Sequence, residues 1–361
     1  MRPLVPVVTC PGHVGHAPDV EIQCGVAVPA YDRVDRMESI LRVLRDHPGI
    51  RLLDPAPHGD EPILRVHDPD MVRFLESAWV EGQETRPAGA SLLFADTFSH
   101  AELYQAAEPI HLWSKHVAAR FGRFCFDTIT GIGPRTYSAA RSAVDTALTA
   151  AEAVAAGSRL AVGLCRPPGH HAARAVFGGG CYLNNAAITA QWLRDRLADR
   201  VAILDLDFHH GNGTQAIFYQ RDDVFYASLH GDPDRSFPYF TGWPSERGVG
   251  KGGGWTLNLP FPSGIDGPAY LALLDEAIDA VNERDLDVVV VSLGFDAYAG
   301  DPSGDGALQT SDYAAVGAAV GRLGAPVVAL LEGGYVPSAL GANLAAWLSG
   351  ASGDATGAPP R

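Results

Sequence analysis

Cysteine is scarce in this chain of 361 residues, and its number and spacing argue against a disulfide framework and against a cysteine-based zinc site. The five cysteines are an odd number, and no two of them form a Cys-x-x-Cys pair. A disulfide framework usually needs an even count, and a cysteine-based zinc site needs closely spaced pairs. Any metal site is therefore expected to use other ligands, and a reducing, cytoplasmic setting is expected.

Basic runs and long apolar stretches are missing as well. The 27 basic and 42 acidic residues give a formal charge of −15, and there is no lysine-rich run or basic stripe. Nucleic-acid binding is therefore not expected. The first residues have no apolar stretch of signal-peptide length, and no segment offers the about 20 apolar residues of a membrane helix. A soluble protein without a membrane partner is the expectation.

What the chain does contain is enough apolar sequence for one large core. Hydrophobic residues make up 47% and charged residues 19%, with no internal repeat and no linker, so residues 1–361 are expected to form one domain. Short apolar runs alternate with helical patterns, which predicts an α/β fold with a central, mainly parallel sheet flanked by helices. The predicted strands are Leu160–Leu164, Val201–Leu206, Val224–Leu229, Leu286–Leu293 and Pro326–Leu331.

Helical periodicity predicts the elements that surround this sheet. The predicted helices are Asp32–Asp46, Pro69–Trp79, Ser138–Ala156, Asn184–Ala198, Pro268–Arg284 and Ser311–Leu323. Residues 81–136 have no clear period before the third of these helices, and a loop of that length usually serves a site entrance or an interface. The small, polar residues 352–361 are expected to be a disordered tail.

Metal-ligating side chains follow two of the predicted strands. Asp205, Asp207 and His209 are spaced two residues apart in VAILDLDFHHG, so strand alternation is expected to place all three on one face, and Asp296 follows LDVVVVSL. Ligands of open α/β sheets bind beyond the carboxyl ends of the strands, so we expect the active site there. Asp207, His209 and Asp296 would give the three protein ligands of a catalytic zinc site. The alternatives are a surface strand end with chance acids, and a capping or turn role for Asp296.

Acid–base groups follow two further predicted strands. His170 and His171 come after a Pro-Pro-Gly turn, and Tyr335 follows two glycines that permit close backbone approach. Paired histidines beside a metal site are candidates for general acid–base catalysis, and the tyrosine for donation to an oxyanion. Surface histidines and a packing tyrosine are the alternatives. No Gly-x-Ser-x-Gly elbow is present, and Gly248–Gly254 follows no predicted strand as a phosphate loop would.

Five ordered motifs resemble those of the histone deacetylase superfamily, which has an arginase-like α/β fold. They are RPPGHHA, DLDFHHGNGTQ, ASLHGDP, SLGFDAYAGDP and EGGY, between about Leu160 and Leu348. Within the superfamily the similarity is greatest to bacterial acetylpolyamine amidohydrolases, through LCRPPGHHA, FYASLHGDPDRSFPYFTGWPSERGVGKGGG and LEGGYVPSALGANLAAWL. The N-terminal part resembles that group more loosely, at Val28–Arg42 and Val66–Trp79.

The resemblance implies a complete hydrolytic centre. One Zn²⁺ ion per chain, with Fe²⁺ as the alternative, would be bound by Asp207, His209 and Asp296. His170 and His171 correspond to the tandem catalytic histidines and Tyr335 to the catalytic tyrosine, while Asp205 and Asn212 correspond to the partners of the two histidines. A neutral Asn212 should leave His171 less basic than a carboxylate would.

The resemblance also implies a structural potassium ion and a substrate pocket. The potassium ligands would come from Asp205, Asp207, His209, Ser228 and Leu229. The pocket residues would be Phe237, Gly179, Gly180 and Cys181. Two positions depart from the family: Gly180 stands where an aromatic wall is usual, and Val117–Phe124 is basic where the acetylpolyamine enzymes carry acidic residues. Both departures bear on polyamine specificity and neither touches the hydrolytic centre.

The expected function is therefore a zinc-dependent deacetylase of a small N-acetylated amine, acetylpolyamine-like or bulkier. Alternatives within enzymes are a deacetylase of acyl-lysine or of a natural-product intermediate, and, ranked low, an arginase-like ureohydrolase with two metals. A non-catalytic ligand-binding protein with a deacetylase fold is the alternative of another class. The resemblance also implies a homodimer in which residues 81–136 form the contact and narrow the entrance.

Overall fold

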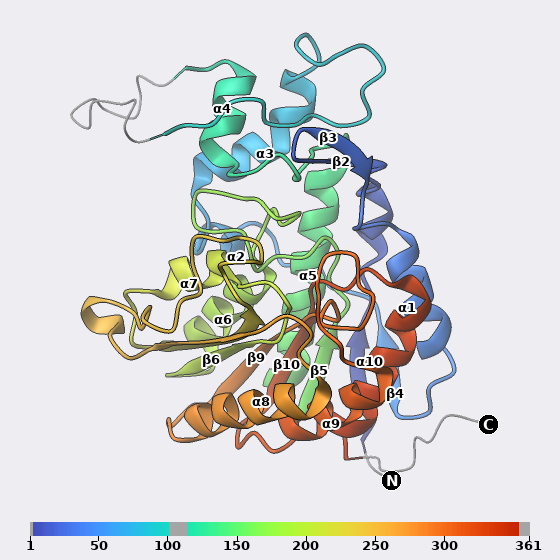
Figure 1. Ribbon diagram of the computed structural model, residues 1–361, viewed down its shortest axis with the longest axis vertical. Coiled ribbons are helices and arrows are strands. Elements are labelled where there is room, and N and C mark those ends of the chain that lie inside the picture. The colour runs from blue at the N-terminus through green and yellow to red at the C-terminus, as the bar shows by residue number, and fades with distance from the viewer. Residues whose placement is uncertain (1–2, 101–113, 354–361) are drawn as a thin grey trace.

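One parallel sheet organises the chain. The computed structural model describes residues 3–100 and 114–353, and its main sheet has eight strands in the order β4-β1-β5-β10-β9-β6-β7-β8 (Figure 1). Every neighbouring pair in this sheet is parallel, which confirms the predicted α/β class. The strands are β4 (Ile50–Leu53), β1 (Val5–Val8), β5 (Leu160–Gly163), β10 (Val327–Leu331), β9 (Val288–Leu293), β6 (Val201–Asp205), β7 (Val224–Gly231) and β8 (Thr256–Phe261).

The central strands are apolar over most of their length because both faces of the sheet are covered. In β9, Val288 and Val290 belong to one hydrophobic cluster, and Val289 and Val291 to the other. Successive side chains of a strand point to opposite faces, so a continuous valine run supplies both clusters. All four valines have exposed fractions of 1% or less, as the sequence pattern predicted.

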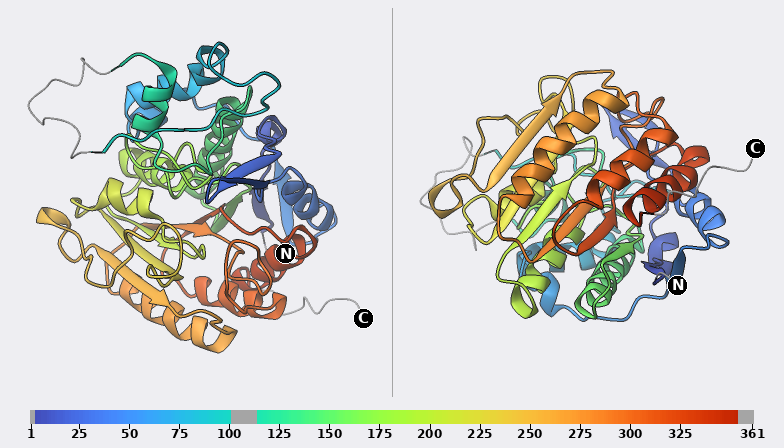
Figure 2. Two further views of the ribbon diagram at one scale, coloured as in Figure 1. Left: turned by 45° about the horizontal axis from the view of Figure 1, so that its top comes forward. Right: turned by 90° about the horizontal axis from the view of Figure 1, so that it is seen from below.

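Helices cover the two faces separately (Figure 2). One face carries α5 (Thr136–Ala155) and α6 (Asn185–Arg196), and the other carries α8 (Gly267–Asn282) with α9 (Thr310–Val320), α10 (Pro337–Ala351) and α1 (Asp35–Leu44). The predicted helices in these places are confirmed with ends shifted by a few residues. Helix α10 was not predicted from periodicity. Small and apolar residues occupy most of its circumference, so it has no distinct polar face.

The N-terminal third adds elements outside the sheet and the helices that cover it (Figure 1). They are the antiparallel hairpin of β2 (Val20–Gln23) and β3 (Val26–Pro29), and the helices α2 (Glu61–Leu64), α3 (Pro69–Glu81) and α4 (Val117–Phe124). Helix α7 (Asn212–Phe218) follows β6, and short 3₁₀ turns occur at Pro11–Gly15 and Gly250–Gly252. The prediction of an irregular segment over residues 81–136 was wrong at α4.

Helix α4 forms because its apolar side chains share one face. Phe121 and Phe124 pack against Phe74 of α3, with ring centroids 5.6 and 5.5 Å apart. Arg120 pairs with Glu81 at the end of α3. Residues 101–113 of the predicted entrance segment, and residues 354–361 of the predicted tail, lie outside the described residues. Among the helices of the described ranges, none is long and apolar enough to cross a membrane.

Candidate metal and catalytic site

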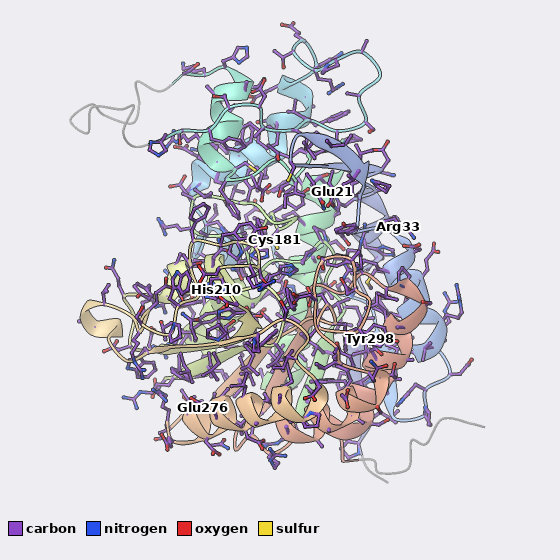
Figure 3. The ribbon with its side chains drawn as sticks, viewed as in Figure 1. Glu21, Arg33, Cys181, His210, Glu276 and Tyr298 are labelled. Atoms are coloured by element: carbon purple, nitrogen blue, oxygen red, sulfur yellow. The ribbon has the colours of Figure 1, made fainter. Side chains whose placement is uncertain are left out.

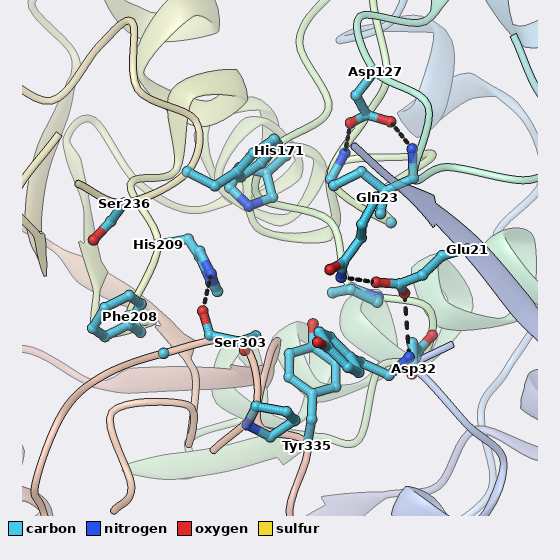
Figure 4. Close-up of a pocket in the computed structure, with 18 of the residues that line it drawn as sticks. Glu21, Gln23, Asp32, Asp127, His171, Phe208, His209, Ser236, Ser303 and Tyr335 are labelled. Atoms are coloured by element: carbon cyan, nitrogen blue, oxygen red, sulfur yellow. Dashed lines mark hydrogen bonds between the residues drawn. The ribbon is translucent and has the colours of Figure 1, made fainter. Parts of the chain in front are cut away.

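A cavity of about 630 Å³ opens beyond the carboxyl ends of the central strands. Its inner wall comes from the segments that follow β5, β6, β9 and β10, and its outer wall from the β2 hairpin and residues 127–129. Figure 4 shows His209, His171 and Tyr335 around this space, with Glu21 and Gln23 on the hairpin side. The predicted location of the active site is where the cavity lies.

Asp207, His209 and Asp296 come together where His209 lines the cavity. Their candidate ligand atoms all lie within 4.8 Å of one another. His209 Nδ1 lies 3.2 Å from Asp207 Oδ1 and 3.1 Å from Asp296 Oδ2. His209 Nε2 lies 3.1 Å from the carbonyl oxygen of Ser303, to which Nε2–H donates. That hydrogen bond fixes the tautomer that leaves the Nδ1 lone pair for a metal ion.

The three residues fit a divalent cation. Asp207 and Asp296 are buried almost completely, and two adjacent buried carboxylates repel each other unless a cation compensates them. Burial and the neighbouring charge of Asp207 raise the pKa of Asp296 to about 7. Space is reserved around these oxygens by glycine: a Cβ on Gly294 would lie 2.3 Å from Asp207 Oδ2, and one on Gly333 2.3 Å from Asp296 Oδ2.

Strand alternation, the reason predicted from the sequence, does not bring these residues together. Strand alternation was expected to bring Asp205, Asp207 and His209 to one face, but β6 ends at Asp205. The turn that follows is held by backbone donors instead: Phe208 N–H donates to Asp296 Oδ1 (2.8 Å), and Gly333 N–H to Asp207 Oδ2 (2.7 Å). Asp205 does not join the triad, and its carboxylate faces His170.

The two tandem histidines have opposite electrostatic surroundings. His170 Nδ1 lies 3.1 Å from Asp205 Oδ2, and, although burial opposes it, the charges of Asp207 and Asp205 raise the pKa of His170 to about 10. His171 Nδ1 lies 2.8 Å from Asn212 Oδ1. Burial, and then the charge of His170, hold the pKa of His171 well below its usual value. His170 is therefore the cationic partner and His171 the neutral one.

Tyr335 lines the same cavity and keeps its proton. Burial raises the pKa of Tyr335 well above its usual value, and the nearby Arg36 only partly opposes this. The Arg36 guanidinium carbon lies 4.6 Å from the centre of the tyrosine ring. Gly334 before it has φ of 112°, a backbone conformation that glycine adopts without strain. A protonated phenol can donate a hydrogen bond into the cavity.

The walls beside His171 differ from each other. Phe237 contacts His171 edge-to-face at 5.0 Å and is stacked on Phe126 at 6.0 Å. A Cβ on Gly179 would lie 2.3 Å from His171 Cδ2, whereas a Cβ on Gly180 would have no atom within 4 Å. Cys181, predicted as a pocket residue, is fully buried inside the molecule (Figure 3) and is not part of the cavity wall.

The residues expected at a potassium ion also lie together. Asp205 of β6 and Ser228 of β7 are partners in the strand register, and both are fully buried. Leu229 follows Ser228 in β7, and the turn after Asp205 carries Asp207 and His209. A buried carboxylate beside a buried hydroxyl suits a hard cation with oxygen ligands.

Several cavity residues were missed from the sequence, among them Glu21 and Asp127 on the outer wall. The Glu21 carboxylate accepts hydrogen bonds from Gln23 Nε2 (2.6 Å) and Tyr31 N–H (3.2 Å), and burial raises its pKa. Asp127 accepts backbone N–H groups of Ile129 and Thr130, both at 3.0 Å. The acidic side of the mouth thus comes from the hairpin, whereas Val117–Phe124, expected near it, packs against α3 and does not line the cavity.

Comparisons with known proteins agree with this geometry. The histone deacetylase domain matches residues 30–351. The acetylpolyamine amidohydrolase of Mycoplana ramosa is 38% identical over 92% of this chain and 95% of its own length. Acetylpolyamine amidohydrolase 1 of Pseudomonas aeruginosa is 39% identical over 95% and 97%. The crystal structure of an acetylpolyamine aminohydrolase from Burkholderia pseudomallei, 36% identical, superimposes with a TM-score of 0.89 over 96% of this chain and 98% of that one.

Proposed function

The chain belongs to the histone deacetylase family, whose members are metal-dependent, and we propose that it hydrolyses the acetyl amide of a small N-acetylated amine with one divalent ion. The observation that carries this proposal is the gathering of a three-ligand triad, a neutral histidine and a protonated tyrosine around one cavity. The triad is Asp207, His209 and Asp296, with Zn²⁺ as the proposed ion and Fe²⁺ as the alternative.

The chain's own groups would carry the proton transfers. When bound, the metal would lower the pKa of a water molecule and polarise the substrate carbonyl. His171, neutral and oriented by Asn212, would accept the proton of the attacking water and return it to the leaving amine. His170 contacts Asp205 Oδ2, and the charges of Asp207 and Asp205 raise its pKa, so it would act as an electrostatic partner and not as the base. Tyr335 would keep its proton and donate a hydrogen bond from its hydroxyl to the oxyanion.

A potassium ion at Asp205, Asp207, His209, Ser228 and Leu229 completes the proposed site. Asp205 would serve both the catalytic centre and the potassium site. Its Oδ2 contacts His170 Nδ1, and its partner in the strand register is Ser228. A monovalent cation there would offset part of the negative charge that three carboxylates concentrate at the ends of β6 and β9.

An acetylpolyamine-like substrate is the first candidate. Relatives that match over 92% and 95% of this chain are acetylpolyamine amidohydrolases, and the mouth of the cavity carries the carboxylate of Glu21. A carboxylate at the mouth would attract the distant ammonium group of a polyamine, and the net charge of −15 would favour a cationic substrate at longer range.

A bulkier acetylated amine is the second candidate, and Gly180 favours it. The cavity is walled by Phe237 on one side of His171 and left open at Gly180, where an added Cβ would touch nothing. A branched or ring-bearing amine would find room there, and so would acyl-lysine. The completeness of the triad, His171 and Tyr335 argues against a non-catalytic binding protein.

Acetate release tests the proposal. The protein, loaded with one equivalent of Zn²⁺, would be assayed with acetylated polyamines, acetyl-lysine peptides and aryl acetamides. We expect metal-dependent acetate release from at least one class, and none from Asp207→Ala, which lacks a ligand. No release from any class by the metal-loaded protein would refute the deacetylase assignment and favour a binding role.

A further inference from the structure

Glu332 is a buried carboxylate that the proposed mechanism does not use. It follows β10 directly, and its exposed fraction is 0%. Its backbone is fixed on both sides: its N–H donates to the carbonyl oxygen of Leu293 (3.0 Å), and its own carbonyl accepts from Arg36 Nη2 (2.7 Å). A fully buried carboxylate is unfavourable unless hydrogen bonds compensate its lost hydration, so its partners indicate why it is there.

The side chain joins three strand ends. Oε2 accepts the backbone N–H of Gly169 at 2.6 Å and that of His170 at 3.3 Å. Oε1 accepts the hydroxyl of Ser292, at 3.1 Å. Ser292 lies on β9, four residues before the ligand Asp296, and is the strand partner of Asp205. Glu332 therefore links the loop of the tandem histidines to the strands that carry the metal ligands.

The loop of the tandem histidines has little freedom elsewhere. The carbonyl oxygen of Pro167 accepts from Asn185 Nδ2 (3.3 Å), and that of His170 accepts from Thr214 N–H (3.1 Å). A Cβ on Gly169 would lie 2.5 Å from the backbone nitrogen of Asn185, so the peptide packs tightly on the start of α6. These contacts fix the carbonyl groups of the loop. The backbone N–H groups of Gly169 and His170, in contrast, donate to the Glu332 carboxylate.

Removing the carboxylate would leave two buried N–H donors without their acceptor. Buried backbone donors without partners are rare because the lost hydration is not replaced. The loop would then shift to pair them with water or with another acceptor, and the rings of His170 and His171 would move with it. A small movement of the rings is enough to lower activity, because a general acid or base must lie within hydrogen-bond distance of the reacting atoms.

We propose that Glu332 is a positioning residue that sets where His170 and His171 stand relative to the metal triad. The inference rests on the deacetylase function proposed above. It requires only hydrogen-bond acceptance and not the negative charge. Glutamine could keep the contacts, since its amide oxygen can accept both N–H groups while its amide nitrogen donates to Ser292 Oγ.

Glu332→Ala and Glu332→Gln separate the positioning role from charge and from folding. Loss of an outer partner at a metal site commonly costs about 10- to 100-fold in activity, and we expect Glu332→Ala to lower kcat by that order. The KM and the single bound metal should be unchanged, because neither substrate contacts nor ligands are touched. Glu332→Gln should restore most of kcat. A general loss of folding would instead reduce metal content and soluble yield in proportion to activity.

Either of two kcat results in the Glu332 variants would overturn the proposal. Wild-type kcat in Glu332→Ala would show that the loop holds its place unaided, and an equal loss in Glu332→Gln would show that the charge is what counts. If Glu332→Ala does not fold, Ser292→Ala decides the matter together with Glu332→Gln. Ser292→Ala frees one carboxylate oxygen, and it should lower kcat to a smaller extent at constant KM. Unchanged kcat in that variant would refute the positioning role.

A structural readout keeps this test independent of the proposed function. In crystal structures of the metal-loaded proteins, the contacts of His170 with Asp205 (3.1 Å) and of His171 with Asn212 (2.8 Å) should persist in Glu332→Gln. At least one should be lost in Glu332→Ala. Unmoved rings in Glu332→Ala contradict the positioning role, whereas wild-type protein that releases no acetate contradicts the deacetylase function.

Discussion

Replacing Gly180 by tyrosine changes the open wall of the cavity directly. Gly180 has φ of 72°, and a Cβ built on it has no atom within 4 Å, so a new side chain would extend into open space. The left-handed conformation costs alanine and tyrosine alike roughly 1–2 kcal/mol. Gly180→Ala is therefore the matched control, because it carries the same backbone strain without a ring.

The size of the effect follows from what the ring would cover. A tyrosine ring facing a slender acyl chain would shield one or two methylenes, at about 0.8 kcal/mol each. That corresponds to a gain of roughly 4- to 15-fold in kcat/KM for a slender substrate, at about 1.4 kcal/mol per tenfold change. The same ring would occupy the room that Gly180 leaves for branched or ring-bearing amines, so their kcat/KM should fall.

The assay compares two substrates in three proteins. The ratio of kcat/KM for N-acetylputrescine to that for a ring-bearing acetamide would be measured in wild type, Gly180→Ala and Gly180→Tyr, since specificity is a difference between substrates. Only Gly180→Tyr should raise the ratio. The reasoning would be refuted if the wild type already prefers acetylputrescine strongly and Gly180→Tyr leaves the ratio unchanged. Selectivity would then have to come from the entrance of the cavity.

Three further predictions concern catalysis and assembly. Tyr335→Phe should lower kcat by about 10²- to 10³-fold with the metal retained. His171→Ala should also lower kcat severely. Near-normal turnover in either variant would mean that the catalytic groups are wrongly assigned. Asn212→Asp should raise the pKa of His171, because a carboxylate favours the imidazolium. Since the base must be neutral, the acidic limb of the kcat/KM profile should move to higher pH, and an unmoved limb would count against His171 as the base. We expect light scattering to report a homodimer, and a monomer at micromolar concentration would contradict this.

The sequence predicted the centre of the site because its chemistry follows the strands. Asp207, His209, Asp296, His170 and Tyr335 each come just after an apolar run, and parallel strands bring their carboxyl ends to one edge. Strand alternation failed as the detailed reason, since the turn after β6 is set by hydrogen bonds from Phe208 and Gly333 N–H groups. Those long-range contacts leave no periodic signal.

The outer wall could not be predicted in the same way. Glu21 lies on a short hairpin, and Asp127 lies in a turn that binds the backbone N–H of Gly179, 52 residues further along the chain. Neither segment has a hydrophobic period that marks its position. Glu332 is visible in the EGGY motif, but its contact with Gly169 spans 163 residues and depends on the order of the strands.

The central claim is that one divalent ion at Asp207, His209 and Asp296 supports amide hydrolysis. A metal titration of the chelator-treated protein, followed by acetate release, tests it most directly. The account predicts no activity without metal and a linear rise that ends at one equivalent of Zn²⁺ per chain, with Asp207→Ala inactive throughout. A rise that ends at two equivalents would indicate a two-metal centre of the ureohydrolase kind, and activity that persists without bound metal would contradict the account.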